Sequence, residues 1–424
     1  MKMNKIQINN KFLIFILFNI FYVIFYLYFK HEVGNDTSIS EWLINYQGGF
    51  TRRGLGGEIN IFFADFFSIS LRDTIFFVQS IIHVSYLLLL YFYLKNINLN
   101  LLQLFALFSP LFLLYPIAEL EALGRKELLI FLFFITIIFL SNEKFKPVLI
   151  NFIIFIFFPI ICFVWEQIVL FAPYFAVVLI CKNKLKTFNE VFIKLIIIFS
   201  PSIIALIIIF LYPLSNEGHV EMCNFLQNNF DERCYMSANL LIKNTIYFDT
   251  FYAHESMKFF PHYFRYIMIF IVGFLPLHLV LYNNEFIGED NFVKKYFKPL
   301  YLYLSLYLPI LLLFAFGHDW GRWIHIMYSL SILLYFYLLK NSMISNFSKE
   351  NFFSKFFQNR KKLLIFVFFI FAFSWNPKTL LTGDIATNSL YKIIYNSSKI
   401  IFNHGGLRIL QDNPIIKFHK KYLE

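Results

Sequence analysis

The sequence predicts an all-α membrane protein, a polytopic transmembrane bundle of about eleven helices joined by short loops. Of the 424 residues, 59% are hydrophobic and only 15% are charged, whereas soluble domains carry about 25% charged residues. Long apolar runs recur along the whole chain, and about 20 apolar residues are enough for a helix to cross a bilayer. We therefore treat residues 1–424 as a single integral membrane domain. The predicted spans are 11–29, 74–94, 100–118, 128–140, 148–164, 166–180, 192–212, 263–282, 299–316, 323–340 and 362–375.

The first apolar run has the length of a signal peptide. It has no small-residue cleavage site and is followed by many further spans, so we expect it to be retained as the first membrane helix. Prolines in or beside several later spans predict kinks in those helices. They are Pro110, Pro116, Pro159, Pro173, Pro201 and Pro309.

The distribution of basic residues predicts the orientation. Loops on the cytoplasmic side are enriched in lysine and arginine. A cytoplasmic N-terminus places most lysines inside and leaves eight of the nine arginines outside, Arg360 being the exception. The sequence thus predicts a multi-pass protein of the plasma membrane. Its outer segments are the loops 30–73, 119–127, 213–262 and 317–322 and the tail 376–424.

The first outer loop contains an arginine pair framed by glycines. Arg52 and Arg53 lie within the run 48–57, which holds five glycines. Glycines let the backbone approach a ligand closely, and guanidinium groups bind phosphate through paired hydrogen bonds. Glu41 and Trp42 precede this run and are a candidate general base and a candidate platform for a sugar ring. After the arginines, residues 58–71 predict an amphipathic helix along the membrane surface.

The second outer loop, residues 119–127, concentrates charge between two predicted spans. Arg125 and Lys126 are candidates for a second phosphate contact. On a helix, Glu121 and Arg125 are four residues apart and their side chains would face each other. A self-neutralised helix end is the alternative reading of this segment.

The third loop holds a histidine, a carboxylate and an arginine between tryptophans. Arg322 is a candidate phosphate ligand, and Asp319, three residues earlier, is positioned to pair with it. His318 and Asp319 are candidate bases for a hydroxyl proton. Trp320 and Trp323 are typical of the membrane interface and also suit sugar stacking. The hypothesis of one phosphate site requires these arginines and those of the other loops to gather in the fold.

Two further features of the sequence bear on the site. Glu166 follows Trp165 inside an apolar region, where a carboxylate usually faces the bundle interior. Cys223 and Cys234 share the predicted outer loop 213–262, so they are candidates for a disulfide in an oxidising compartment. The remaining cysteines lie in or beside spans and are interpreted as ordinary apolar residues, and His83 and His278 as structural ones.

Several classes of chemistry have no support in the sequence. No HExxH, DxD or His/Cys ligand spacing occurs in an outer loop, so no metal and no cofactor are predicted; a divalent ion held by Asp36 or Glu41 is the one alternative left open. There is no phosphate-binding loop for ATP, no dinucleotide fingerprint and no serine nucleophile elbow. The net charge of +11 is spread over loop lysines rather than gathered in a basic domain, so nucleic-acid binding is not expected.

Three blocks of this sequence carry a resemblance to a known family. They are Trp42 with residues 49–55, residues 124–127, and residues 319–323. These blocks look like those of polytopic proteins from bacterial surface-polysaccharide gene clusters. The chain resembles O-antigen (oligosaccharide repeat-unit) polymerases and related GT-C-like glycosyltransferases. The resemblance covers most of the chain as a hydropathy plan and a few short segments as motifs.

The resemblance implies a glycosyltransferase at the outer face of the bacterial inner membrane, in lipopolysaccharide or capsule biosynthesis. The donor would be an oligosaccharide on undecaprenyl diphosphate, and the acceptor a hydroxyl of a lipid-linked repeat unit. Membrane lipids, a chain-length regulator and a flippase are the partners that this reading implies. In GT-C enzymes a catalytic carboxylate commonly follows the first helix, where this chain has Asp36 and Glu41.

Three other functions remain open from the sequence. A GT-C transferase could instead use a sugar on a polyprenyl monophosphate. A flippase or transporter of lipid-linked sugars would line a deep central cavity with charge, whereas here the charged clusters lie on one predicted side of the membrane. A membrane accessory protein without catalysis would tolerate loss of the loop arginines.

Overall fold

The computed structural model describes most of the chain. The described residues are 6–8, 10–32, 37–142, 145–234, 236–239, 241, 260–345, 356–357, 359–379 and 388–401. The candidate residue Asp36, most of the loop 242–262 and the end of the tail, residues 402–424, lie outside them.

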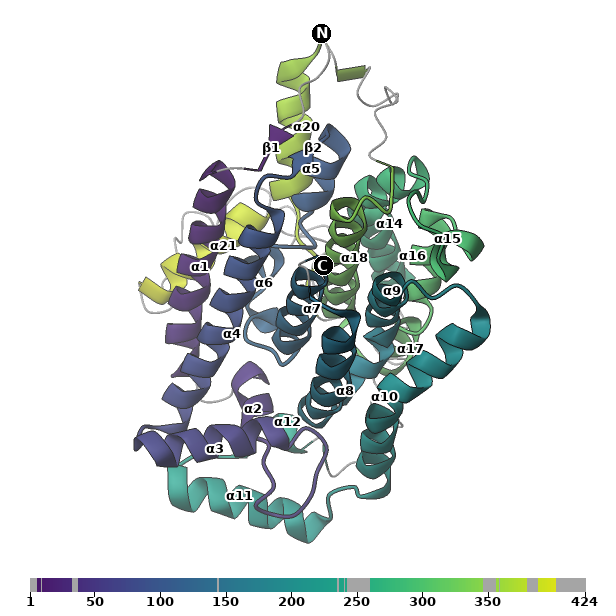
Figure 1. Ribbon diagram of the computed structural model, residues 1–424. Helices are drawn as coiled ribbons and strands as arrows, with labels where there is room; N and C mark the ends of the chain where they lie inside the picture. Colours follow the sequence, from purple (N-terminus) through teal and green to yellow (C-terminus); the bar gives the residue numbers. More distant parts are fainter. Residues whose placement is uncertain are drawn as a thin grey trace.

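The described chain is an all-α bundle, as predicted, with a single two-stranded sheet in which Ile6 pairs with Leu99 (Figure 1). Seven of its helices are long and apolar enough to cross a membrane. They are α1 (Asn10–His31), α4 (Leu71–Leu94), α8 (Pro147–Val164), the 3-10 turn η2 (Glu166–Phe171) continued by α9 (Ala172–Asn183), α10 (Phe188–Leu211), α14 (Phe260–Tyr282) and α18 (Trp320–Lys340).

Shorter elements join these helices. They are β1 (Ile6–Gln7), α2 (Thr37–Leu43), α3 (Leu55–Phe67), β2 (Asn98–Leu99), α5 (Leu101–Leu107), α6 (Tyr115–Ala118), the 3-10 turn η1 (Leu120–Ala122), α7 (Leu128–Asn142), α11 (Asn216–Phe230), α12 (Met236–Asn239), α15 (Phe292–Tyr296), α16 (Pro299–Tyr307), α17 (Leu311–Phe316), α20 (Lys361–Phe373) and α21 (Ser389–Ile401).

Two predicted spans are interrupted. The apolar stretch 100–118 is not one helix, because α5 ends at Leu107 and the next helix, α6, has only four residues. Pro110 lies in this break; proline lacks the backbone N–H that a continuing helix needs. The stretch 299–316 is divided in the same way into α16 and α17 around Pro309.

Helix α18 forms the centre of the bundle. Its residues from Gly321 to Leu338 are all buried, and it packs on α7, α9, α14 and α17. Outer helices such as α1, α8 and α10 are buried on one side and expose rows of phenylalanine and isoleucine on the other. A helix that is apolar on all sides and exposed on one suits a hydrocarbon environment.

One end of the bundle, which we call the rim end, holds the last turn of α1, helix α3 and helix α11 (Figure 1). Helix α3 forms within the stretch predicted to be an amphipathic helix, and it exposes Phe62, Phe66 and Phe67. It spans Leu55–Phe67 rather than 58–71, because Ser68 adopts a left-handed conformation that ends it and Ser70 caps the N-terminus of α4.

The segment after α20 returns into the bundle. The backbone oxygen of Thr379 accepts a hydrogen bond from Gly321 N at 3.1 Å, and that of Lys378 accepts one from the Tyr266 hydroxyl at 3.0 Å. A Cβ at Gly321 would lie 1.9 Å from the Lys378 oxygen, so only glycine allows this approach. Further on, Lys392 of α21 forms an ion pair with Glu119.

Candidate functional site

Helix α2 places a carboxylate inside the protein. Glu41 is buried, and its Oε1 forms an ion pair with a guanidinium nitrogen of Arg125. Arg125 also donates to the Thr37 hydroxyl at 2.8 Å, so one arginine holds the first turn of α2 as well as its acidic side chain. A buried carboxylate is stable only when a cation and hydrogen bonds compensate it.

The segment 124–127 is not helical, which changes the predicted pairing. Gly124 has φ +77°, a left-handed conformation, and its oxygen accepts hydrogen bonds from Trp42 Nε1 at 2.8 Å and Gln79 Nε2 at 2.7 Å. Arg125 donates to the backbone oxygen of Glu121 at 2.8 Å rather than to its carboxylate. The predicted pair of side chains Glu121 and Arg125 was therefore wrong, because it assumed a helix here.

The arginine pair of the first loop meets a carboxylate from a distant helix. Arg53 donates from Nε to both oxygens of Glu166, at 3.0 and 2.9 Å, and from Nη2 to Oε1 at 2.7 Å. Arg52 lies 3.8 Å from the same carboxylate. The Arg53 backbone is left-handed, and its oxygen accepts a hydrogen bond from Lys126 Nζ at 2.7 Å. As predicted, Glu166 faces the protein interior.

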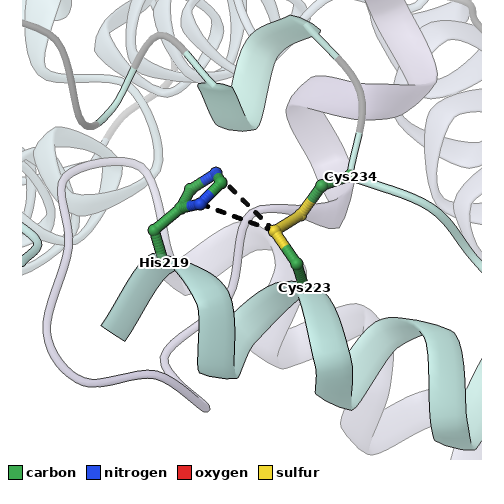
Figure 2. Close-up of side chains that lie close together, drawn as sticks. All are labelled: His219, Cys223 and Cys234. Carbon is green, nitrogen blue, oxygen red and sulfur yellow. Dashed lines mark hydrogen bonds between the residues drawn. A yellow bond between two sulfur atoms is a disulfide. The ribbon is translucent and has the colours of Figure 1, made fainter. Parts of the chain in front are cut away.

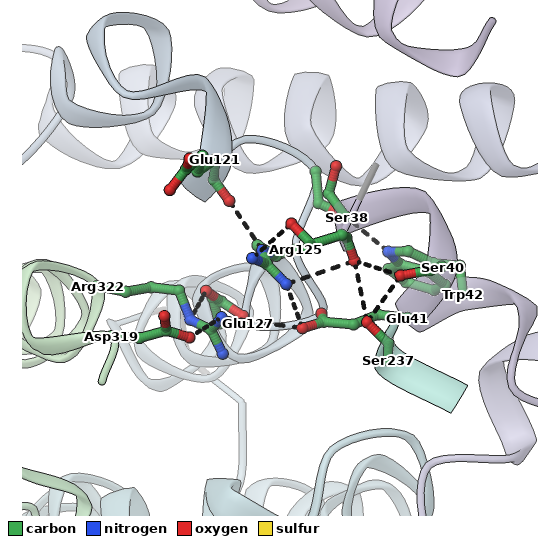
Figure 3. Close-up of polar contacts among 12 residues, drawn as sticks. Ser38, Ser40, Glu41, Trp42, Glu121, Arg125, Glu127, Ser237, Asp319 and Arg322 are labelled. Atoms are coloured by element: carbon green, nitrogen blue, oxygen red, sulfur yellow. Dashed lines mark hydrogen bonds and ion pairs between the residues drawn. The ribbon is translucent and has the colours of Figure 1, made fainter. Parts of the chain in front are cut away.

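Helix α18 brings the third loop to the same place. Arg322 Nη1 lies 2.6 Å from Asp319 Oδ2, which confirms the pair predicted from their spacing, and 3.8 Å from Glu41 Oε1. Arg322 Nε lies 2.9 Å from Glu127 Oε1 without the alignment of a hydrogen bond. Figure 3 shows these side chains converging from α2, the 119–127 segment and α18.

The three motif regions of the sequence thus form one charge cluster. We use this name for the cations Arg52, Arg53, Arg125, Lys126 and Arg322 with the carboxylates Glu41, Glu127, Glu166 and Asp319. Five formal positive charges face four negative ones, so the charge cluster has a positive excess of one when all groups are ionised.

Burial sets unusual protonation properties in this cluster. Loss of water raises the pKa of the Glu127 carboxyl to about 7, against the opposing effect of Arg322. Burial also disfavours ionised Glu41, but Arg125 and Arg322 outweigh burial and hold its pKa below the ordinary value. Burial lowers the pKa of the Lys126 ammonium to about 7. The cluster therefore contains four arginines that stay charged, and one carboxyl and one ammonium group that change protonation near neutral pH.

Several buried polar atoms of this region have no hydrogen-bond partner among the described residues. They are Glu41 Oε2, both carboxylate oxygens of Glu127, Arg322 Nε and Trp323 Nε1. Most buried polar groups in proteins are paired, since an unpaired one costs about 1–3 kcal/mol. Hydroxyl groups, which both donate and accept, would satisfy the two carboxylates and the indole.

Comparison of the chain with known protein families, with curated proteins and with solved structures finds no match. The chemistry of the site therefore rests on its own geometry.

The predicted aromatic platforms differ in their surroundings. Trp42 and Trp323 are buried, with the Lys126 ammonium 5.8 Å and the Arg322 guanidinium 4.6 Å from their ring centres. Trp320 is half-buried and packs edge to face on Tyr263, Tyr266 and Phe314. Sugar stacking on these rings stays a prediction, and so does a role of the half-buried His318 as a base.

Sequence reasoning left two residues of the charge cluster out of the candidate site. Glu166 carried a signal, a carboxylate within an apolar region, but nothing in the sequence identified Arg53 as its partner. Glu127 ends a charged run that suggested only a self-neutralised loop. Its buried position became visible only in the fold.

A second polar group lies outside the charge cluster. His219, Cys223 and Cys234 offer a nitrogen and two sulfur atoms within 4.8 Å of one another, a spacing that suits a metal ion (Figure 2). The structure joins the two cysteines in a disulfide, as the sequence allowed, which removes the thiolates that a metal would require. The charge-cluster carboxylates, in turn, already face guanidinium groups.

Proposed function

We propose that the protein is an integral membrane glycosyltransferase that acts on undecaprenyl-diphosphate-linked oligosaccharides at the outer face of the bacterial inner membrane. The reaction would polymerise O-antigen or capsule repeat units. The proposal includes a GT-C-like arrangement of about eleven spans, in which shorter apolar helices such as α7 add to the long ones. The convergence of the three predicted loop motifs in one buried charge cluster is the observation that supports it.

The location of the buried charges supports chemistry on one side of the membrane. The buried Lys, Arg, Asp and Glu residues of the described chain all lie in, or within three residues of, the four predicted outer loops. They are Lys30, Glu41, Glu119, Arg125, Lys126, Glu127, Glu232, Arg265 and Arg322. A flippase needs polar groups along the whole path of its substrate, so this one-sided distribution favours transfer over transport.

The proposed reaction assigns a task to each part of the charge cluster. Arg53, Lys126 and Arg322 would stabilise the diphosphate as it leaves with the bonding electrons of the sugar C1–O bond. The acceptor hydroxyl would attack C1 and transfer its proton to Glu127. Its pKa near 7 makes it a better proton acceptor than Glu41, whose lowered pKa suits a fixed anion that holds Arg125.

Surface-polysaccharide length tests this proposal. A deletion strain would be complemented with the wild type, Glu127→Gln, Arg53→Ala, Arg322→Ala or the control Lys184→Ala, which removes an exposed cation paired with Glu289. We expect wild type and Lys184→Ala to restore the length ladder on a gel, and the three site variants to leave single repeat units at normal protein level.

Three results separate the alternatives. An unchanged ladder in all three site variants would contradict polymerase activity and favour a role without catalysis. Intracellular accumulation of complete lipid-linked repeat units in the deletion strain would point to transport instead. Loss of one sugar branch on a ladder of normal length would indicate a transferase with a polyprenyl monophosphate donor.

A further inference from the structure

The disulfide joins α11, which lies at the rim end, to the segment before α12. Cys223 is on α11, and Cys234 is eleven residues later, two residues before α12. His219 is one helical turn before Cys223, and its two ring nitrogens lie 3.7 and 3.6 Å from the Cys223 sulfur (Figure 2). Both sulfur-bearing residues are only half-buried, so a small thiol or a partner thiol can reach them.

Helix α12 connects this disulfide to α2. The Ser40 hydroxyl donates to Ser237 Oγ at 2.7 Å, and Ser237 in turn donates to the backbone oxygen of Thr37 at 3.5 Å. Thr37 is also held by Arg125, the ion-pair partner of Glu41. Ser237, three residues after Cys234 in the chain, therefore connects the segment of the disulfide to the helix that carries Glu41, and Figure 3 shows Ser237 beside Ser40 and Glu41.

Helix α12 is short and packs on α2 and on a small apolar cluster. It has only four residues, far fewer than a helix needs for stability in isolation. The apolar cluster beneath it is small and separate from the main core: Ile44, Leu214, Met222, Ala238 and Leu241, with the two cysteines packed against it. Helix α11 has additional support, since Arg72 forms an ion pair with Glu232 just after it. The disulfide thus links the short helix α12 covalently to the longer helix α11.

We propose that Cys223–Cys234 is a redox-modification site whose state controls the order of α2 and, through it, the position of Glu41 and Arg125. The reductant is a dithiol. Its first thiolate attacks Cys234 Sγ, the S–S bond breaks, and Cys223 leaves as a thiolate stabilised by a hydrogen bond from the His219 imidazole. The second thiol of the reductant then displaces Cys234 and closes the reductant's own disulfide. Two electrons pass to the protein, and α12 is released from α11.

Hydrogen exchange measured by mass spectrometry tests the coupling without any glycosyl transfer. The full-length protein in lipid nanodiscs would be compared oxidised and after reduction by dithiothreitol, with a chelator present so that free thiols hold no metal. We expect amide exchange in α2 (Thr37–Leu43) and α12 to rise about tenfold or more on reduction, and exchange in α4 to stay unchanged. Unchanged exchange in α2 after complete reduction, verified by two additional alkylated thiols, would overturn the proposal.

Two variants make the result independent of the reductant. Cys223→Ser with Cys234→Ser should show fast α2 exchange with or without dithiothreitol. Ser237→Ala keeps the disulfide and should raise exchange in α2 while α11 stays protected. If Ser237→Ala left α2 as slow as in the oxidised wild type, the connection through Ser237 would be refuted.

The role of His219 has its own measurement. With His219→Gln, we expect reduction of the disulfide by dithiothreitol to slow by about threefold to tenfold, because the departing Cys223 thiolate loses its partner. An equal rate in wild type and variant would remove His219 from the exchange step. Because none of these readouts involves a sugar substrate, they hold or fail separately from the proposed transferase activity.

Discussion

Glu127 is held between opposing effects. Its carboxylate is buried and approaches Arg322 without an aligned hydrogen bond, so the attraction of the guanidinium only partly offsets the loss of water. A carboxyl whose pKa is raised by folding binds a proton more firmly in the native state than in the unfolded chain. This linkage makes its protonation measurable as stability, whatever reaction the protein performs.

The direction of the pH effect follows from the higher pKa of Glu127 in the native state than in the unfolded chain. Below its ordinary pKa of 4.5, Glu127 is protonated in both states, and the stabilisation is lost as pH rises through about 7. We expect wild type to lose about 3 kcal/mol relative to Glu127→Gln between pH 4.5 and pH 8. Lys126 titrates equally in both proteins and cancels. Thermal melts of wild type and Glu127→Gln across this pH range measure the difference. If the stability of the two proteins changed with pH in the same way, the raised pKa of Glu127 would be contradicted.

The Arg53–Glu166 pair gives a second prediction at this scale. Glu166→Gln leaves the partly buried Arg53 without its full counter-charge, so we expect a loss of about 3 kcal/mol in stability. The double variant Arg53→Gln, Glu166→Gln should recover a large part of that loss, because neither charge then remains unpaired. A double-mutant cycle in nanodiscs measures this coupling, and strictly additive losses would show that the two side chains do not interact.

Which ion pairs could be predicted from the sequence depended on how far apart the two residues lie in the chain. Asp319 and Arg322 were paired correctly from a spacing of three residues. Glu41 and Arg125 are 84 residues apart, and Arg53 and Glu166 are 113 apart, so local periodicity carries no information about them. The residue types at each position suggested phosphate binding, but only the fold reveals that a carboxylate already holds each arginine.

At the scale of the elements, the packing of residues 375–379 against the start of α18 depends on Gly321. We expect Gly321→Ala to destabilise the protein by about 1–3 kcal/mol, because the added methyl group would displace the backbone at Lys378. Gly317→Ala is the matched control, since its Cβ would meet its nearest neighbour at an ordinary 3.5 Å. Thermal melts compare the two; equal stability would show that the 375–379 segment moves aside readily.

Hydropathy predicted the long elements well and the broken ones poorly. The helices α1, α4, α8 and α10 agree with their predicted spans because each is continuously apolar and begins or ends at a polar turn. The stretch 100–118 is equally apolar, so composition alone did not distinguish one helix from two short ones. Its prolines were interpreted as kinks, and the fold shows a full interruption.

At the scale of the whole molecule, the orientation inferred from lysines predicts opposite exposures for two sites. Val220 is exposed on α11 at the rim end, and Lys184 is exposed between α9 and α10. In intact cells with a permeable outer membrane, we expect an impermeant maleimide to label Val220→Cys, and to label Lys184→Cys only after lysis. The cysteines at 162 and 181 are buried and the others are disulfide-bonded, so the background is low. The reverse pattern would invert the topology.

The way in which the helices pack in the bundle could not be predicted from the sequence. An all-α class, a helix after the arginine pair and the grouping of charge in loops follow from composition and periodicity. The central position of α18 and the insertion of residues 375–379 beside it follow from packing among helices far apart in sequence. Hydropathy treats each span separately, so it does not describe such contacts.

Because the residues of the charge cluster are far apart in the chain, they become available at different times during synthesis. At a synthesis rate of about 5–20 residues per second, Arg125 emerges about 4–17 s after Glu41. Arg322 is 281 residues after Glu41 in the chain and emerges about 14–56 s after Glu41. Until Arg125 emerges, Glu41 lacks its direct ion-pair partner, and until Arg322 emerges it lacks the second guanidinium group beside it. Biogenesis of this protein therefore ends with the closing of its polar centre, after nearly all of its helices have entered the membrane.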